Sequence, residues 1–217
     1  NKQNIFKNDI KKIIILDKRL KELKNEKIST IQKIFFLTDL CKNYGTLAFS
    51  GIARSAFVAT SILRDLQKKS IITENDLANF YSNINTITNE LNKDLYLLEL
   101  KKIKKNFFLN KYGHLRPSTY SISSKNYKDG FNFYFSNKRN NKIIKTKNTQ
   151  IFKKNSIKKI NTLLINEKLK INFEQLINFA AEAIKQREYS KYIFTKGIDE
   201  IFFNLKKMAT EMKINPN

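Results

Sequence analysis

The chain has 217 residues, of which 41% are hydrophobic and 17 are Phe, so it can bury the core of one sizeable domain. This composition excludes a chain that is disordered over most of its length. Only 5 Gly and 2 Pro interrupt it, which favours long helices over a fold of many strands and turns. The sequence therefore predicts a mainly α, helical bundle-like domain with one long irregular loop.

The formal net charge is +23, from 42 Lys and Arg against 19 Asp and Glu. One interpretation is a polyanionic partner such as a nucleic acid, whose phosphates the lysines would neutralise. The other is compositional, because Lys, Asn and Ile recur almost everywhere and no arginine-rich block stands out. We favour the compositional interpretation and keep nucleic acid as the alternative. In either case the chain should attract anions.

The chain holds one cysteine, Cys41, and one histidine, His114. An internal disulfide is therefore impossible, and a zinc or other soft-metal site is not expected. The apolar run KKIIIL is too short to cross a bilayer, and no signal-peptide pattern occurs. We expect a cytoplasmic protein without a membrane span. Because the sequence begins with Asn1 rather than Met, we also expect a fragment of a longer, multidomain enzyme.

Apolar residues at helical spacing predict a first helix over residues 7–23 and a second over residues 31–42. Ser29 or Thr30 would cap the second helix through its hydroxyl group. The following residues, 43–45, read Asn-Tyr-Gly and predict a break in the chain.

The next stretch predicts a helix over residues 46–66, with small residues between its apolar positions. Such a helix packs closely and is expected to be central. Arg54 lies in this apolar run, where it either extends to the surface or reaches into a cleft. Thr73 then predicts the N-cap of one long helix that runs to about residue 101.

Residues 113–150 predict one long loop, inserted between two helical halves. Within it, the aromatic run at 131–135 is expected to be a strand or a hydrophobic loop on the core. Residues 136–150 are expected to form an exposed connection. The whole chain, 1–217, would then be a single helical domain.

Two further helices are predicted after this loop, over residues 156–169 and from residue 173 to near the C-terminus. Asn172 would cap the last helix, with Gln175 at the reciprocal position of a capping box. This is the longest helical stretch that the sequence predicts.

Motifs for a complete catalytic site are absent from the sequence. There is no glycine-rich phosphate loop, no G-x-S-x-G nucleophile elbow and no H-E-x-x-H metal motif. We therefore expect no catalytic residue and no metal ligand in this chain. The polar chemistry gathers instead in three stretches: YGTLAFSGIARSAF (44–57), YGHLRPSTY (112–120) and AIKQREYSKYIFTK (183–196).

The middle stretch holds the only histidine of the chain. Gly113 can end the preceding helix by adopting a positive φ, and Pro117 holds Arg116 extended. Arg116 could then bind a carboxylate or phosphate through two hydrogen bonds, and His114 could transfer a proton near neutral pH. The alternative is structural: His114 caps a helix and Arg116 pairs with an acid such as Glu188.

These stretches resemble segments of the phosphoenolpyruvate-utilising phosphotransferases, the phosphoenolpyruvate synthase and pyruvate phosphate dikinase-like proteins. YGHLRPSTYSI is similar to their YGHLRPGTYDI-type loop, of which rifampin phosphotransferase carries a more distant version. CKNYGTLAFSGIARSAFVA is similar to their upstream YGTLPFAGLAR-type segment. AIKQREYSKYIFTKGIDEIF is similar to their downstream GREYAKFxFTKNLSDAL-type segment. The three segments occur in the family's order, over residues 44–203.

The resemblance implies a kinase in which an ATP-grasp domain uses ATP and Mg to phosphorylate a histidine on a swivelling domain. This chain would be the helical middle domain, with no cofactor of its own, and would bind a small-molecule acceptor. His114 is not the phosphohistidine, because the family's Thr/Ser-His motif does not occur here. The expected substrate-binding residues are His114, Arg116, Arg54, Arg187, Glu188, Thr119 and Tyr120.

The chain departs from the family pattern at three positions. Ser118 stands where glycine is usual, and Ala48 where proline is usual. Ser121 stands where aspartate is usual, which could remove a polar contact to Arg116.

Overall fold

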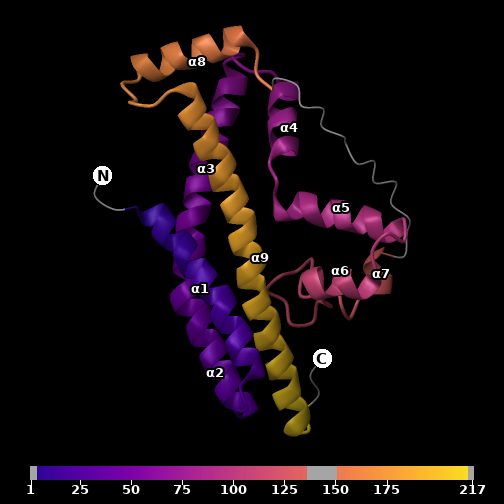
Figure 1. Cartoon of the computed structure of the whole chain (residues 1–217). Helices are drawn as coiled ribbons and strands as arrows, with labels where there is room; N and C mark the ends of the chain where they lie inside the picture. The colour runs from indigo at the N-terminus through magenta and orange to yellow at the C-terminus, as the bar shows by residue number, and fades with distance from the viewer. Residues whose placement is uncertain (1–3, 136–150, 215–217) are drawn as a thin grey trace.

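The computed structural model describes residues 4–135 and 151–214, and their secondary structure is helical (Figure 1). No strand occurs within these residues, which confirms the mainly α prediction. The helices are α1 (Ile5–Asn25), α2 (Thr30–Leu40), η1 (Cys41–Thr46), α3 (Leu47–Lys68), α4 (Glu74–Asn83), α5 (Ile87–Glu99), α6 (Lys105–Tyr112), α7 (Phe131–Phe135), α8 (Lys154–Asn166) and α9 (Phe173–Glu211).

The centre of the fold is a bundle of α1, α2, α3 and α9. Figure 1 shows the long α9 running beside the other three, while α8 crosses one end and α5, α6 and α7 lie to one side. The apolar face of α1 is fully packed, with Ile13 1% and Leu16 0% exposed. On α3 the corresponding face carries small residues, including Ala48 and Ala59, so this helix lies close to its neighbours.

The predicted break at residues 43–45 is wrong. Cys41–Thr46 forms a turn of π-helix that joins α2 to α3 without interruption. The hydroxyl of Thr46 donates to the carbonyl of Cys41 at 3.2 Å. Gly45 is needed here for a close approach rather than a stop, because a Cβ on it would lie 2.6 Å from the ring of Phe194. The predicted cap at Ser29 is confirmed, as part of a capping box with Gln32.

The single long helix predicted after Thr73 is also wrong beyond its start. The cap at Thr73 is confirmed, but α4 ends at Asn83 and α5 begins at Ile87. The side chain of Thr86 accepts a hydrogen bond from the backbone of Asn89 and caps α5. Local polar side chains therefore compete with the helix at this point, although the apolar stripe continues through it.

The aromatic run at residues 131–135 forms the short helix α7, neither a strand nor a loop. Phe131 and Phe135 pack edge-on against Phe108 of α6, with ring centroids 6.2 Å and 5.7 Å apart. The predicted connection over residues 136–150 lies outside the described residues.

The last helix, α9, begins as the sequence predicts. Asn172 and Gln175 form the expected capping box. The helix then continues through Gly197, where a Cβ would lie 2.4 Å from Sγ of Cys41. Glycine at this position lets α9 approach the turn between α2 and α3.

One stretch in the described part of the chain, the continuous helix Thr30–Lys68, is long and apolar enough to cross a membrane by length and composition alone. Core helices meet the same criteria, and Ile52 and Ala59 of this stretch are fully buried in the bundle. The absence of a membrane span therefore stays a prediction.

Candidate functional site

The three polar stretches of the sequence meet at one pocket of about 460 Å³. It lies between the start of α3, the loop that follows α6 and the middle of α9. Three of the predicted site residues, Arg54, Tyr120 and Arg187, come together here. We call it the two-arginine pocket; its lining residues are Thr46, Phe49, Ser50, Ala53, Arg54, Phe57, Tyr120, Arg187 and Phe194.

Aromatic rings form the apolar part of the two-arginine pocket. The rings of Phe49 and Phe194 are stacked, with centroids 6.1 Å apart and planes 7° from parallel. Gly45 allows this arrangement, because any side chain there would meet the Phe194 ring. The pocket can therefore hold the organic part of a ligand as well as its charge.

Arg187 is held over an aromatic ring of the same pocket. Its guanidinium lies 5.4 Å from the ring centroid of Phe57 and pairs with Glu188 at 3.4 Å. Glu188 in turn accepts a hydrogen bond from Thr88 of α5 at 3.0 Å. Glu188 is thus a group that positions Arg187 and joins α5 to α9.

Arg54 is exposed on α3 and lines the pocket from the opposite helix. Within residues 4–135 and 151–214 it makes no hydrogen bond and no ion pair. A guanidinium group that forms no ion pair within these residues and lines the same pocket as a second one is suited to bind a carboxylate or phosphate.

His114 lies outside the two-arginine pocket. Its Nε2–H donates to the carbonyl of Tyr192 at 3.1 Å, and its ring meets the Tyr192 ring edge-on at 4.8 Å. Burial, together with the charge of nearby Lys196, lowers the pKa of His114 to about 3. Such an imidazole is neutral and weakly basic at physiological pH. The geometry favours the structural alternative for His114, although it is α9 rather than a helix end that the ring contacts.

Arg116 is also built into the structure. It forms an ion pair with Asp199 of α9, and the exposed fraction of its side chain is only 6%. It donates further to the carbonyls of Ser121 and Ser124, and its guanidinium lies 5.0 Å from the ring centroid of Phe202. The predicted pairing of Arg116 with Glu188 is therefore wrong. The acid that pairs with Arg116 is Asp199, three turns further along α9.

The loop between α6 and α7 owes its shape to these contacts rather than to an unusual glycine. Gly113 ends α6 but has a φ of −59°, so the predicted positive φ is wrong. Its carbonyl accepts a hydrogen bond from the backbone of Lys128, which closes the loop on itself. Tyr120 is 67% exposed at the two-arginine pocket, and Thr119 beside it is half-buried.

A cluster around Lys111 fixes the base of this loop, and sequence reasoning missed it. The Lys111 ammonium lies 3.2 Å from Glu90 and 3.0 Å from Asp94, both on α5. The hydroxyl of Tyr192 donates to the carbonyl of Lys111 at 2.7 Å. Only the tertiary fold brings these groups of α5, α6 and α9 together.

Asp9 was missed as well, although the sequence holds a signal for it. Asp9 shares the buried face of α1 with Ile13, Leu16 and Leu20, to which it is related by helical spacing. An acid at a core position of an amphipathic helix is unusual. Asp9 lines a second pocket of about 450 Å³, to which Arg54 also belongs.

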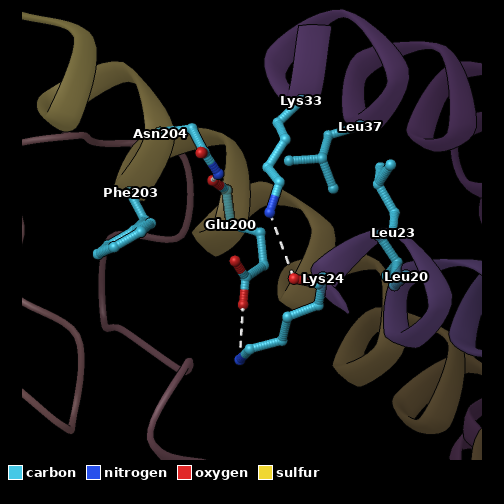
Figure 2. A pocket seen from close by; sticks show the side chains of 8 residues that line it. All are labelled: Leu20, Leu23, Lys24, Lys33, Leu37, Glu200, Phe203 and Asn204. Carbon is cyan, nitrogen blue, oxygen red and sulfur yellow. Dashed lines mark hydrogen bonds and ion pairs between the residues drawn. The ribbon is translucent and has the colours of Figure 1, made fainter. Parts of the chain in front are cut away.

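A smaller crevice of about 160 Å³ lies between α1, α2 and α9 (Figure 2). Its charged groups satisfy one another. Lys24 pairs with Glu200 at 3.1 Å, and Lys33 donates to the backbone carbonyl of Lys24 at 3.3 Å. Each lysine side chain of this crevice thus already has a partner within the protein.

Metal chemistry finds no support in the part of the chain that is described: no group of three or more His, Cys, Asp or Glu side chains is placed to hold an ion there. Comparison of the chain with protein-family models, with curated proteins and with solved structures finds no match.

Proposed function

We propose that this chain is the helical domain of an ATP-dependent, phosphoenolpyruvate synthase-like phosphotransferase, and that the two-arginine pocket binds the small-molecule acceptor. ATP and Mg would be bound by an ATP-grasp domain, and the phosphohistidine would be carried by a swivelling domain of the same cytoplasmic polypeptide. The chain by itself would bind but would not catalyse.

The observation that carries the proposal is where the three family-like stretches lie. They are far apart in the sequence, yet Arg54, Tyr120 and Arg187, one from each stretch, line a single pocket. The same stretches also bond to one another through the pairs His114–Tyr192 and Arg116–Asp199. The three stretches that resemble segments of one family therefore lie together in the folded chain.

The charges of the pocket suit an acceptor with a carboxylate or phosphate group. Two guanidinium groups line the pocket; Arg187 pairs with Glu188, whereas Arg54 forms no ion pair within the described residues and is available to an anion. Arginine presents a planar fork that matches these anions. The stacked rings of Phe49 and Phe194 would contact the organic part of the acceptor.

Binding measured by calorimetry on this chain tests the pocket, with phosphoenolpyruvate and inorganic phosphate as probes. Arg187→Gln should weaken phosphoenolpyruvate binding about tenfold, since it removes a charged hydrogen-bond donor. Arg64→Gln is the matched control, because Arg64 is exposed on α3 and lines none of the pockets described above. Equal losses in both variants would contradict a specific site.

The role in phosphotransfer is tested in the full-length polypeptide. Arg187→Gln should slow transfer from the phosphohistidine to the acceptor and leave its formation from ATP unchanged. If both steps proceed at the normal rate, the domain is a structural spacer.

A further inference from the structure

The pocket between α1, α3 and α9 contains a buried carboxylate. Asp9 is only 8% exposed and lies against the backbone of Gly51 on α3. A Cβ on Gly51 would come within 2.1 Å of Oδ2 of Asp9, so glycine makes room for this carboxylate. The two helices are therefore shaped around Asp9.

The Asp9 carboxylate forms no bond to the described part of the chain. Within the described residues it accepts no hydrogen bond and forms no ion pair. Burial raises the pKa of Asp9, while the charges of Lys12 and Arg54 act in the opposite direction. The side chain lines the pocket, so its carboxylate oxygens are open to a ligand that donates a hydrogen bond.

The same pocket also holds a positive charge. Arg54 lines it too, but its guanidinium is not within ion-pair distance of Asp9, and no other acid pairs with it in the described part of the chain. The apolar side chains of Phe6, Val58 and Phe179 also line the pocket. A ligand that bridges Asp9 and Arg54 would satisfy both groups at once.

The charge balance selects the kind of ligand. Asp9 contributes one negative charge, whereas Arg54 and the nearby Lys12 contribute two positive charges. A cation is therefore disfavoured, and a simple anion would leave Asp9 without a donor. A neutral donor such as a hydroxyl, on a molecule that also carries an anionic group, meets both requirements.

We propose that this pocket, the Asp9 pocket, binds a small hydroxylated organic anion whose hydroxyl donates to Asp9 and whose carboxylate or phosphate pairs with Arg54. The proposal goes beyond the function proposed above, because it requires no phosphotransfer. Apart from Arg54, the residues it concerns lie outside the two-arginine pocket. Arg54 lies between the two pockets and could serve either one.

Two pairs of small anions test whether a hydroxyl group on the ligand strengthens binding, and whether the anionic group is a phosphate or a carboxylate. Glycerol 3-phosphate is compared with propyl phosphate, and 3-hydroxybutyrate with butyrate, by NMR titration of this chain. The hydroxylated member of at least one pair should bind about tenfold more tightly, as expected for a hydrogen bond to a charged acceptor. The pair that shows the larger preference tells phosphate from carboxylate. Equal binding within both pairs would overturn the proposal.

Variants assign the preference to Asp9. Asp9→Ala should abolish the preference for the hydroxylated probe and retain the weaker binding of its partner. Gly51→Ala provides a second route, because it displaces the carboxylate without removing it. Arg187→Gln should leave the preference unchanged, which separates this site from the two-arginine pocket. A preference that survives both Asp9→Ala and Gly51→Ala would refute the assignment.

Discussion

The carboxylate of Asp9 on α1 lies against Gly51 on α3, so closely that a Cβ on Gly51 would stand 2.1 Å from Oδ2. Since α1 and α3 are neighbours in the central bundle, this contact couples the packing of two core helices to a charged group in a pocket.

A double-mutant cycle tests this contact. Asp9→Ala should stabilise the ligand-free chain by about 1 kcal/mol, because it removes a carboxylate that burial desolvates. In that background Gly51→Ala should add up to about 1 kcal/mol, as alanine replaces glycine within a helix. In the wild-type chain Gly51→Ala should not give this gain in stability, because the new Cβ would clash with the Asp9 carboxylate. Urea denaturation measures all four proteins, and additive effects would contradict the contact.

The acid sensitivity of the fold should depend on His114. Its pKa is about 3 in the folded chain, against 6.5 for the free side chain. Below pH 6.5 the unfolded chain therefore binds a proton that the folded chain excludes, so the stability due to neutral His114 falls as the pH falls. Between pH 7 and pH 5 this loss should reach about 2 kcal/mol.

Two measurements check this prediction. His114→Gln should reduce the loss of stability between pH 7 and pH 5, with the wild-type chain as reference. As the chain has one histidine, its imidazole gives a single set of NMR signals, which should not titrate above pH 5 while the chain is folded. Titration near pH 6.5 would show that the ring is solvated.

The ion pair between Arg116 and Asp199 should be a strong determinant of stability. Arg116→Met leaves a largely buried carboxylate without its cation, and we expect a loss of about 3 kcal/mol. Lys18→Met is the control, because Lys18 forms an ion pair with Glu22 while its side chain is 79% exposed. That change should cost less than about 0.5 kcal/mol. Similar losses in the two variants would show that the Arg116 pair is solvent-screened.

The salt and sequence dependence of DNA binding should distinguish nonspecific attraction by the net charge from a specific nucleic-acid site. With a net charge of +23, the chain should bind DNA at low salt and release it steeply as salt rises. If the charge is only compositional, Arg54→Gln and Arg64→Gln should weaken this binding equally and slightly. Fluorescence anisotropy with two unrelated DNA sequences measures it, and a marked sequence preference would favour the nucleic-acid alternative.

Local signals in the sequence were sufficient for the helices and most of their starts. The caps at Ser29, Thr73 and Asn172 could be predicted because each acts within three residues along the chain. The π-helical turn at Cys41–Thr46 could not, since Gly45 serves a contact with Phe194 on a distant helix. The same residue type signals a stop in one context and close packing in another.

The sequence by itself determined the helical class and the three stretches in which polar chemistry gathers, because composition and periodicity are properties of the chain. Only the tertiary structure decided what each charged side chain does. It paired Arg116 with Asp199, and it brought Arg54 and Arg187 to one pocket. It also buried Asp9 beside Gly51. The reason is physical: pairing and burial depend on distances between helices, which the spacing of residues along one helix does not fix.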